Sequence, residues 1–134
     1  MPIDVHVVTP EREVWAGAAQ MVIARGIDGE VGILAGHAPL LVQLAIGPLR
    51  IQQPGDEWLA AVVDGGFLHV TSKGGETRVD VLADNAELSS EIDAEAARRT
   101  VERLRGVDAG LPEAEAAAAK AELHRAQARV NQAG

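Results

Sequence analysis

The sequence contains no cysteine and very few aromatic residues, and both shortages limit what the chain can be. Without cysteine it has no disulfide, no thiolate zinc site and no cysteine nucleophile, which fits a reducing compartment such as the cytoplasm. Aromatic residues make up 2% of the chain, namely two Trp and one Phe. The core must therefore be built from Val, Leu, Ile and Ala, which pack well but supply few large anchoring side chains.

Positive charge and long apolar runs are also scarce. The chain has 12 Lys and Arg against 20 Asp and Glu, a formal net charge of -8. Nucleic-acid binding depends on clustered basic side chains that release counterions, so nucleic acid is disfavoured as a partner. The longest apolar run, residues 38–47, is interrupted by Pro39 and Gln43, and the first residues lack the basic start and apolar centre of a leader. We therefore expect no membrane-spanning segment.

What is present is the composition of a folded protein, with 47% apolar and 24% charged residues in 134 positions. Between residues 3 and 82, apolar side chains alternate with polar ones in short runs, which is typical of half-buried strands. We expect eight to ten strands in an antiparallel β-sandwich or flattened barrel. Turn signals separate the runs at Thr9-Pro10, Asp28-Gly29, Gly36-His37, Gly47-Pro48, Pro54-Gly55-Asp56, Gly65-Gly66 and Lys73-Gly74-Gly75.

After residue 86 the pattern changes to helical spacing. Ser90 with an acid three positions later predicts a helix start, and Gly106 predicts its end. Pro112 suits the first position of a second helix, which is rich in alanine. The fold class is therefore α+β, with a β-sandwich domain over residues 1–86 and an antiparallel two-helix hairpin over residues 87–134.

Enzyme signatures are missing from the sequence. The histidines at positions 6, 37, 69 and 124 form none of the close pairs that bind metals, and Lys73-Gly74-Gly75 reads as a hairpin turn rather than a phosphate loop. Asp64 has no obvious partner acid or nucleophile in the sequence. We therefore predict no catalytic residue, no metal site and no enzyme activity of the chain alone.

One run carries a specific family signature, Gly29-Glu30-Val31-Gly32-Ile33-Leu34-Ala35-Gly36-His37-Ala38-Pro39-Leu40-Leu41. It resembles the motif G-E-x-G-I-x-x-G-H-A-P-L-L of epsilon subunits of bacterial F-type ATP synthases, with Ala35 where that family often has Pro. The resemblance continues at Gly47-Pro48-Leu49, at Asp64-Gly65-Gly66-Phe67 and at Val81-Leu82-Ala83-Asp84-Asn85-Ala86. Agreement over this many positions is far more specific than a lone glycine fingerprint.

The resemblance implies a non-catalytic rotor subunit of the central stalk, on the cytoplasmic face of the cell membrane and attached there only through the complex. It implies that the β-domain contacts the gamma subunit and the c-ring, with Gly29, Glu30, Val31 and nearby His37 facing the ring. It also implies that the hairpin either packs on the sandwich or extends into the alpha/beta head and restrains ATP hydrolysis. From residue type alone, Glu30 and His37 could equally be turn residues without a partner.

Some members of that family bind ATP through a pattern I/L-D-x-x-R-A, a nearby acid and two arginines on the second helix. Ala96 stands at the position of the motif arginine, so a cation is missing and ATP is disfavoured as a regulatory ligand. We expect no cofactor. Two of the matching residues are arginines that could instead cap the helix or meet acids of a partner. The matching positions are Glu87, Ile92, Asp93, Ala97, Arg125 and Arg129.

Two further interpretations stay open at this level. The chain could be a β-sandwich module that binds a small ligand or peptide, with its helices serving for dimerisation. The alanine-rich helix could be easily detached, because small side chains bury little apolar area, or its alanines could reflect helix propensity alone.

Overall fold

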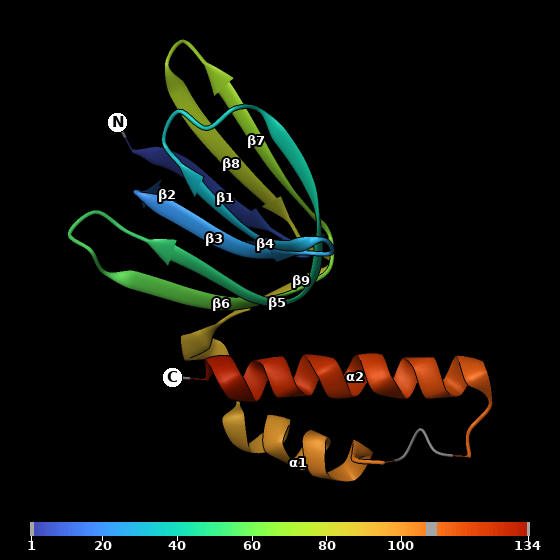
Figure 1. Ribbon diagram of the computed structural model, residues 1–134. Coiled ribbons are helices and arrows are strands. Elements are labelled where there is room, and N and C mark those ends of the chain that lie inside the picture. The colour runs from blue at the N-terminus through green and yellow to red at the C-terminus, as the bar shows by residue number, and fades with distance from the viewer. Residues whose placement is uncertain (1, 107–109, 134) are drawn as a thin grey trace.

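A computed structural model describes residues 2–106 and 110–133 of the chain, and Figure 1 shows a layered β-domain with two helices beneath it. Within these ranges there are nine strands, a short 3-10 turn and two helices, which confirms the predicted fold class. The elements are β1 (Ile3–Val8), β2 (Glu13–Ala19), β3 (Met21–Gly26), β4 (Gly29–Leu34), β5 (Leu40–Gln52), β6 (Trp58–Asp64), β7 (Phe67–Lys73), β8 (Glu76–Leu82), β9 (Asn85–Leu88), η1 (Ser89–Glu91), α1 (Ala94–Leu104) and α2 (Glu113–Gln132).

The long strand β5 joins the two layers of the sandwich. Its first part pairs with β7, in a layer ordered β2-β1-β8-β7-β5, and its second part pairs with β3 and β6, in a layer ordered β4-β3-β5-β6-β9. The turn predicted at Gly47-Pro48 is therefore wrong, since both residues lie inside β5, opposite Val63 and Val62. They lie where β5 passes from one layer to the other, and the Arg25 side chain comes within 3.2 Å of where a Cβ on Gly47 would be.

One ladder departs from the antiparallel pattern. β1 runs parallel to β8, with Val5 opposite Val79, whereas the other ladders between the described strands are antiparallel. A parallel pair needs a long crossover connection, and here the rest of the sandwich provides it. β1 is consequently held between β2, its immediate successor, and a strand about 70 residues further along the chain.

The core lies between the two layers and is almost entirely aliphatic. In β1 and β8 every second residue points inward, as their alternating burial shows. The largest fully buried side chains are Ile3, Ile33, Leu49, Ile51, Leu68, Val5, Val7, Val22, Val63, Val70, Val79 and Val81. Because these residues come from both layers, the sandwich has one continuous hydrophobic core.

The first helix begins later than its sequence signal predicts. Asp93, not Ser90, is the N-cap of α1, and its carboxylate accepts a hydrogen bond of 3.0 Å from the Ala96 main-chain N–H. Ser90 lies in the preceding 3-10 turn, because β9 continues to Leu88 by pairing with β6. Gly106, with φ of 76°, follows the end of α1 as predicted.

The two helices lie side by side as the predicted hairpin, with α2 between α1 and the sandwich (Figure 1). The face of α1 that carries Ala97, Val101 and Leu104 is buried, and α2 buries Ala126 and Ala128. Arg103 Nη2 on α1 and Glu122 Oε1 on α2 lie 2.9 Å apart. Part of the connection between the helices, residues 107–109, lies outside the described residues.

Candidate functional site

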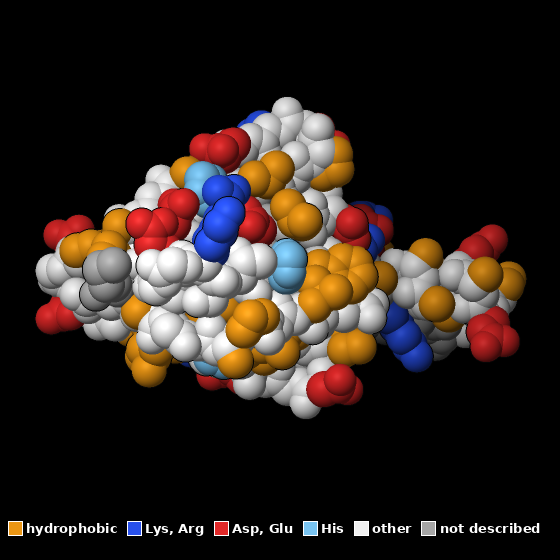
Figure 2. Space-filling model, turned by 90° about the horizontal axis from the view of Figure 1, so that it is seen from above, with side chains coloured by type: hydrophobic (Ala, Val, Ile, Leu, Met, Phe, Trp, Pro, Cys, Tyr) orange, Lys and Arg blue, Asp and Glu red, His pale blue; other side chains and the backbone are white. Residues whose placement is uncertain are grey.

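A group of large apolar side chains lies exposed on the outer face of the β2-β1-β8-β7-β5 layer. Leu41 is 63% exposed, Leu82 51% and Phe67 46%. The three are neighbours in the sheet, because Phe67 pairs with Leu82 and with Gln43, while Leu41 pairs with His69, two residues from Phe67. Figure 2, which views the side opposite the helices, shows hydrophobic side chains gathered beside a histidine. We call Leu41, Phe67 and Leu82 the apolar patch.

Charged side chains on the neighbouring strands are paired with one another. The Arg78 Nε lies 3.0 Å from Asp80 Oδ2, and the Arg78 Nη1 lies 4.0 Å from Asp4 Oδ2. The hydrogen bond to Asp80 raises the pKa of Arg78 above its ordinary value, so the guanidinium stays charged. These charges already have partners within the chain. Covering the apolar patch with another protein would therefore be more favourable than covering any other part of this face.

A groove at one end of β4 contains three of the four residues predicted to bind a partner. It has a volume of about 370 Å³, and Gly29, Glu30 and Val31 line it together with Ile27 and Leu41. Its position follows from the β3–β4 turn, where Gly29 has a φ of 133° that suits glycine. Since Leu41 also belongs to the apolar patch, the groove and the patch form one continuous surface.

The Glu30 carboxylate faces solvent in this groove. Its side chain is 58% exposed, and its Oε1 lies 3.9 Å from Arg50 Nη2 on β5. An exposed pair at this distance contributes little to folding. Glu30 is therefore available to a partner with polar or basic groups.

His37 does not join Glu30, contrary to the prediction that the two lie near each other. It follows the far end of β4, and the extended strand alone places Leu34 about 13 Å from Glu30. There the His37 main-chain N–H donates to the Leu34 carbonyl over 3.1 Å, and the ring Nδ1 lies 2.7 Å from the Ala38 carbonyl oxygen. His37 thus lies in the β4–β5 connection, away from the groove.

The predicted nucleotide residues divide into two groups. Glu87, Arg125 and Arg129 meet where α2 crosses β6 and β9, together with Asp64. The Arg129 Nη2 lies 2.8 Å from Glu87 Oε1, and the Arg125 Nε lies 3.5 Å from Asp64 Oδ2. The cavity between them has a volume of about 20 Å³, room for about one water molecule. The charges that could hold a nucleotide are here paired with each other.

The other three predicted nucleotide residues have structural roles around α1. Asp93 caps the helix, Ala97 is 1% exposed in the hairpin, and Ile92 precedes the cap as a half-buried residue. None of them lines the cavity at Arg125 and Arg129. The sequence pattern therefore does not form a single pocket in this arrangement of the helices.

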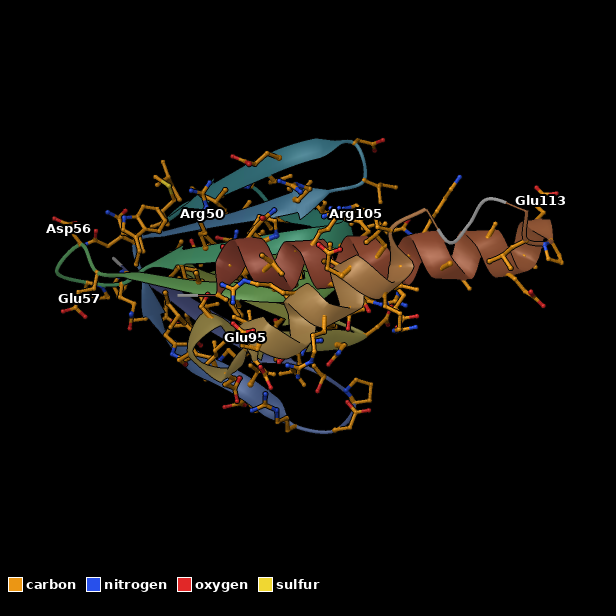
Figure 3. The ribbon with its side chains drawn as sticks, turned by 90° about the horizontal axis from the view of Figure 1, so that it is seen from below. Arg50, Asp56, Glu57, Glu95, Arg105 and Glu113 are labelled. Atoms are coloured by element: carbon orange, nitrogen blue, oxygen red, sulfur yellow. The ribbon has the colours of Figure 1, made fainter. Side chains whose placement is uncertain are left out.

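The N-terminal half of α2, which begins at Glu113, projects beyond the sandwich. In Figure 3, seen from below, Glu113 lies at the end of α2 well past the edge of the sheet, whereas Glu95 and Arg105 mark the two ends of α1. Figure 1 shows the same overhang. Several alanines here are exposed, at positions 114, 117 and 118. Among the described residues, none covers these three alanines in this arrangement.

Sequence reasoning missed the apolar patch, although a signal was present. Phe67 and Leu82 occupy the outward phase of strands whose inward phase, Leu68 and Val81, is already apolar. A large apolar residue at the polar phase of an alternating strand predicts a second buried face. Among the described residues there is no cluster of His and acidic side chains fit for a metal ion, and no helix long and apolar enough to cross a bilayer.

Comparison with known proteins agrees with this architecture. A family model described as "ATP synthase, Delta/Epsilon chain, beta-sandwich domain" matches residues 2–89. The ATP synthase epsilon chain of Brevibacillus brevis is 46% identical over 101 residues, which cover 75% of this chain and 74% of the relative. That of Frankia casuarinae is 50% identical over 90 residues, covering 66% of this chain and 100% of the relative.

A solved structure has the same fold over almost the whole chain. A chain in the cryo-EM structure of the Euglena gracilis mitochondrial ATP synthase, OSCP/F1/c-ring, superposes with a TM-score of 0.82 at 27% identity. The match covers 94% of this chain and 78% of that chain, so it includes helices as well as the sandwich. With a β-domain matched from residue 2 to residue 89 and relatives this similar, the chain belongs to the ATP synthase delta/epsilon chain family.

Proposed function

We propose that this chain is a non-catalytic central-stalk subunit of an F-type ATP synthase, and that its β-sandwich attaches the gamma subunit to the c-ring. The observation that carries this proposal is the apolar patch of Leu41, Phe67 and Leu82, which is exposed in the free chain and lies on the outward phase of β5, β7 and β8. A subunit of a permanent complex needs such a face, since apolar area in the centre of an interface supplies much of the affinity.

In this proposal the two parts of the continuous surface have different partners. The apolar patch packs against gamma, and the groove at Gly29, Glu30 and Val31 faces the polar loops of the c-ring. The exposed Glu30 carboxylate supplies charge complementarity at the ring, which sets orientation more than affinity. The chain is then held at the cytoplasmic face of the membrane by its complex, and it contributes mechanical coupling rather than chemistry.

The hairpin is proposed to be a separable regulatory part. In the docked arrangement it lies beneath the sandwich, and when released it can extend towards the alpha/beta head and restrain ATP hydrolysis. Two observations support separability. The helix that contacts the sheet buries alanines, which bury little apolar area. The Frankia relative, matched over its full length by 90 residues of this 134-residue chain, has no room for a complete second helix.

The test of the proposed attachment is binding to purified gamma subunit. Phe67→Ser and Leu41→Ser should each weaken binding by about tenfold or more, because each removes an apolar anchor from the interface centre. Trp58→Ser is a matched control, since Trp58 is 51% exposed but lies on β6, outside the patch. Equal losses for all three variants, or a stable dimer of the chain without affinity for gamma, would support a generic binding module instead.

A further inference from the structure

Arg125 and Arg129 hold α2 against the sandwich through two ion pairs that span the boundary between the helices and the sheet. The hydrogen bond from Arg129 Nη2 to Glu87 Oε2, 3.1 Å long, joins residues 42 positions apart. The second pair joins Arg125 to Asp64, at the end of β6. Neither pair joins two residues of the hairpin or two residues of the sandwich. Both pairs therefore stabilise the docking of the hairpin on the sandwich.

The spacing of the four charges fits this role. The two arginines are separated by one helical turn, about 6 Å along the axis, and therefore lie on one face of α2. The two acids are diagonal neighbours on β6 and β9, because Asp64 pairs with Asn85 while Glu87 pairs with Val62. Diagonal positions of a ladder are about 7–8 Å apart. Both pairs can therefore form at once without distorting either element.

The apolar contact beneath the pairs is small. The buried residues of α2 are both alanines, Ala126 and Ala128, and Val62 of the sheet, which is 6% exposed, lines the cavity between the pairs. The four charged side chains are between 24% and 39% exposed, which leaves them partly shielded from solvent. In this setting a close ion pair contributes more than a fully exposed one, and it remains sensitive to salt.

We infer that these two pairs form a latch that keeps the hairpin docked without any bound nucleotide. The cavity between them is too small for a phosphate, and both arginines already have carboxylate partners. A nucleotide phosphate could reach the arginines only by displacing Glu87 and Asp64. The controlling signal of the latch is then the ionic environment or a competing charged surface on a partner. This inference rests on the proposed regulatory role of the hairpin, whose position the latch would set.

The experiment measures the detached fraction of hairpin in the full-length isolated chain. Because the chain has no cysteine, Ser72→Cys on β7 and Ala117→Cys on α2, both exposed, accept two spin labels at defined places. Pulsed electron resonance then gives the distance distribution between the sandwich and the hairpin. Breaking one pair with Arg129→Glu or Glu87→Arg should raise the ratio of detached to docked molecules about fivefold. The swap that combines both changes should return it to within about twofold of the parent.

Two controls make the result decisive. Arg98→Glu alters the charge in the same way, but Arg98 pairs with Glu95 inside α1 and should leave the ratio unchanged. Arg129→Gln, with folding confirmed by circular dichroism, covers the case in which a charge reversal prevents folding. Single changes without effect, or a swap that fails to restore docking, would overturn the latch, and so would millimolar ATP that increases docking of the parent chain. If the latch variants detach the hairpin but leave ATP hydrolysis by the assembled complex unaltered, the regulatory role fails while the latch stands.

Discussion

Arg12, in the β1–β2 turn, donates a hydrogen bond of 3.0 Å to the carboxylate of Glu91, 79 residues later in the 3-10 turn before α1. The same Glu91 oxygen accepts the Leu88 main-chain N–H at 3.0 Å. One carboxylate thus ties the end of the last strand to a turn of the sandwich. The connection to the helices therefore starts from a fixed point.

This contact predicts a pH dependence of stability. The hydrogen bond from Arg12, followed by that from Leu88, lowers the pKa of Glu91 below its ordinary value. A carboxyl with a lowered pKa in the folded state stabilises the fold above its unfolded-state pKa, and this contribution is lost as the pH falls through the folded-state pKa. Urea unfolding of the parent and of Glu91→Gln should therefore differ at neutral pH and converge in the acidic range. Glu95→Gln, an exposed acid of α1, is the control and should follow the parent.

Gly66 should be the least replaceable of the turn glycines. It has a φ of 95°, and an added Cβ would collide with the Leu82 carbonyl oxygen and the Ala83 main chain. Gly66→Ala should cost more than about 3 kcal/mol of unfolding free energy, because the clashing atoms belong to the backbone and cannot move away by a change of rotamer. Gly74→Ala, with φ of 61° and open space at the Cβ, should cost only about 1 kcal/mol. Equal losses in thermal or urea unfolding would contradict the steric argument.

Removal of residues 93–134 should leave a folded sandwich that still binds gamma. The cut lies after Ile92, so β9 and its pairing with β6 are retained, as is the contact between Glu91 and Arg12. ATP hydrolysis by the complex should rise several-fold if the hairpin restrains it. Hydrolysis unchanged from that of the complex with the full-length chain would rule out the restraining role, whereas loss of gamma binding would mean that the helices contribute to attachment.

Glu30→Lys should reduce coupling to the c-ring with little effect on the stability of the fold. Glu30 is exposed and only loosely paired with Arg50, so the change should cost about 0.5 kcal/mol or less of stability. ATP-driven proton pumping by the reconstituted complex should fall, because in the proposed arrangement the reversed charge would face the c-ring. Glu57→Lys is the matched control, since Glu57 is an exposed acid in the β5–β6 turn, outside the groove. A large drop in melting temperature for Glu30→Lys would show that its carboxylate serves the fold.

The parts of the fold that depend on local periodicity could be predicted from the sequence. Alternation in Ile3, Val5 and Val7 predicted a half-buried strand, and Gly106 and Pro112 predicted the end of one helix and the start of the next. The turn predicted at Gly47-Pro48 was wrong, because glycine and proline occur at a bend within a strand as well as in a turn between strands. The helix start predicted at Ser90 was wrong, because pairing between β9 and β6 outweighed the local capping signal.

The candidate sites depended on contacts that no local pattern contains. Gly29, Glu30 and Val31 could be placed together because they are consecutive, whereas the distance of His37 from them follows from the extended course of β4. The pairing of Arg129 with Glu87 requires α2 to cross β9, which only the tertiary fold determines. The motif named Glu87, Arg125 and Arg129 without revealing that Arg129 pairs with Glu87 and Arg125 with Asp64.

The position of the first strand has a consequence for how the chain acquires its structure. On one side, β1 pairs with β8, which ends at Leu82. This side of β1 therefore stays unpaired until most of the chain has been synthesised. Strand pairing between segments this distant in sequence is slow to form and exposes aliphatic edges in the meantime. During biosynthesis, closure of the β-domain should therefore be a late event, and its early intermediates should be the forms most in need of chaperones.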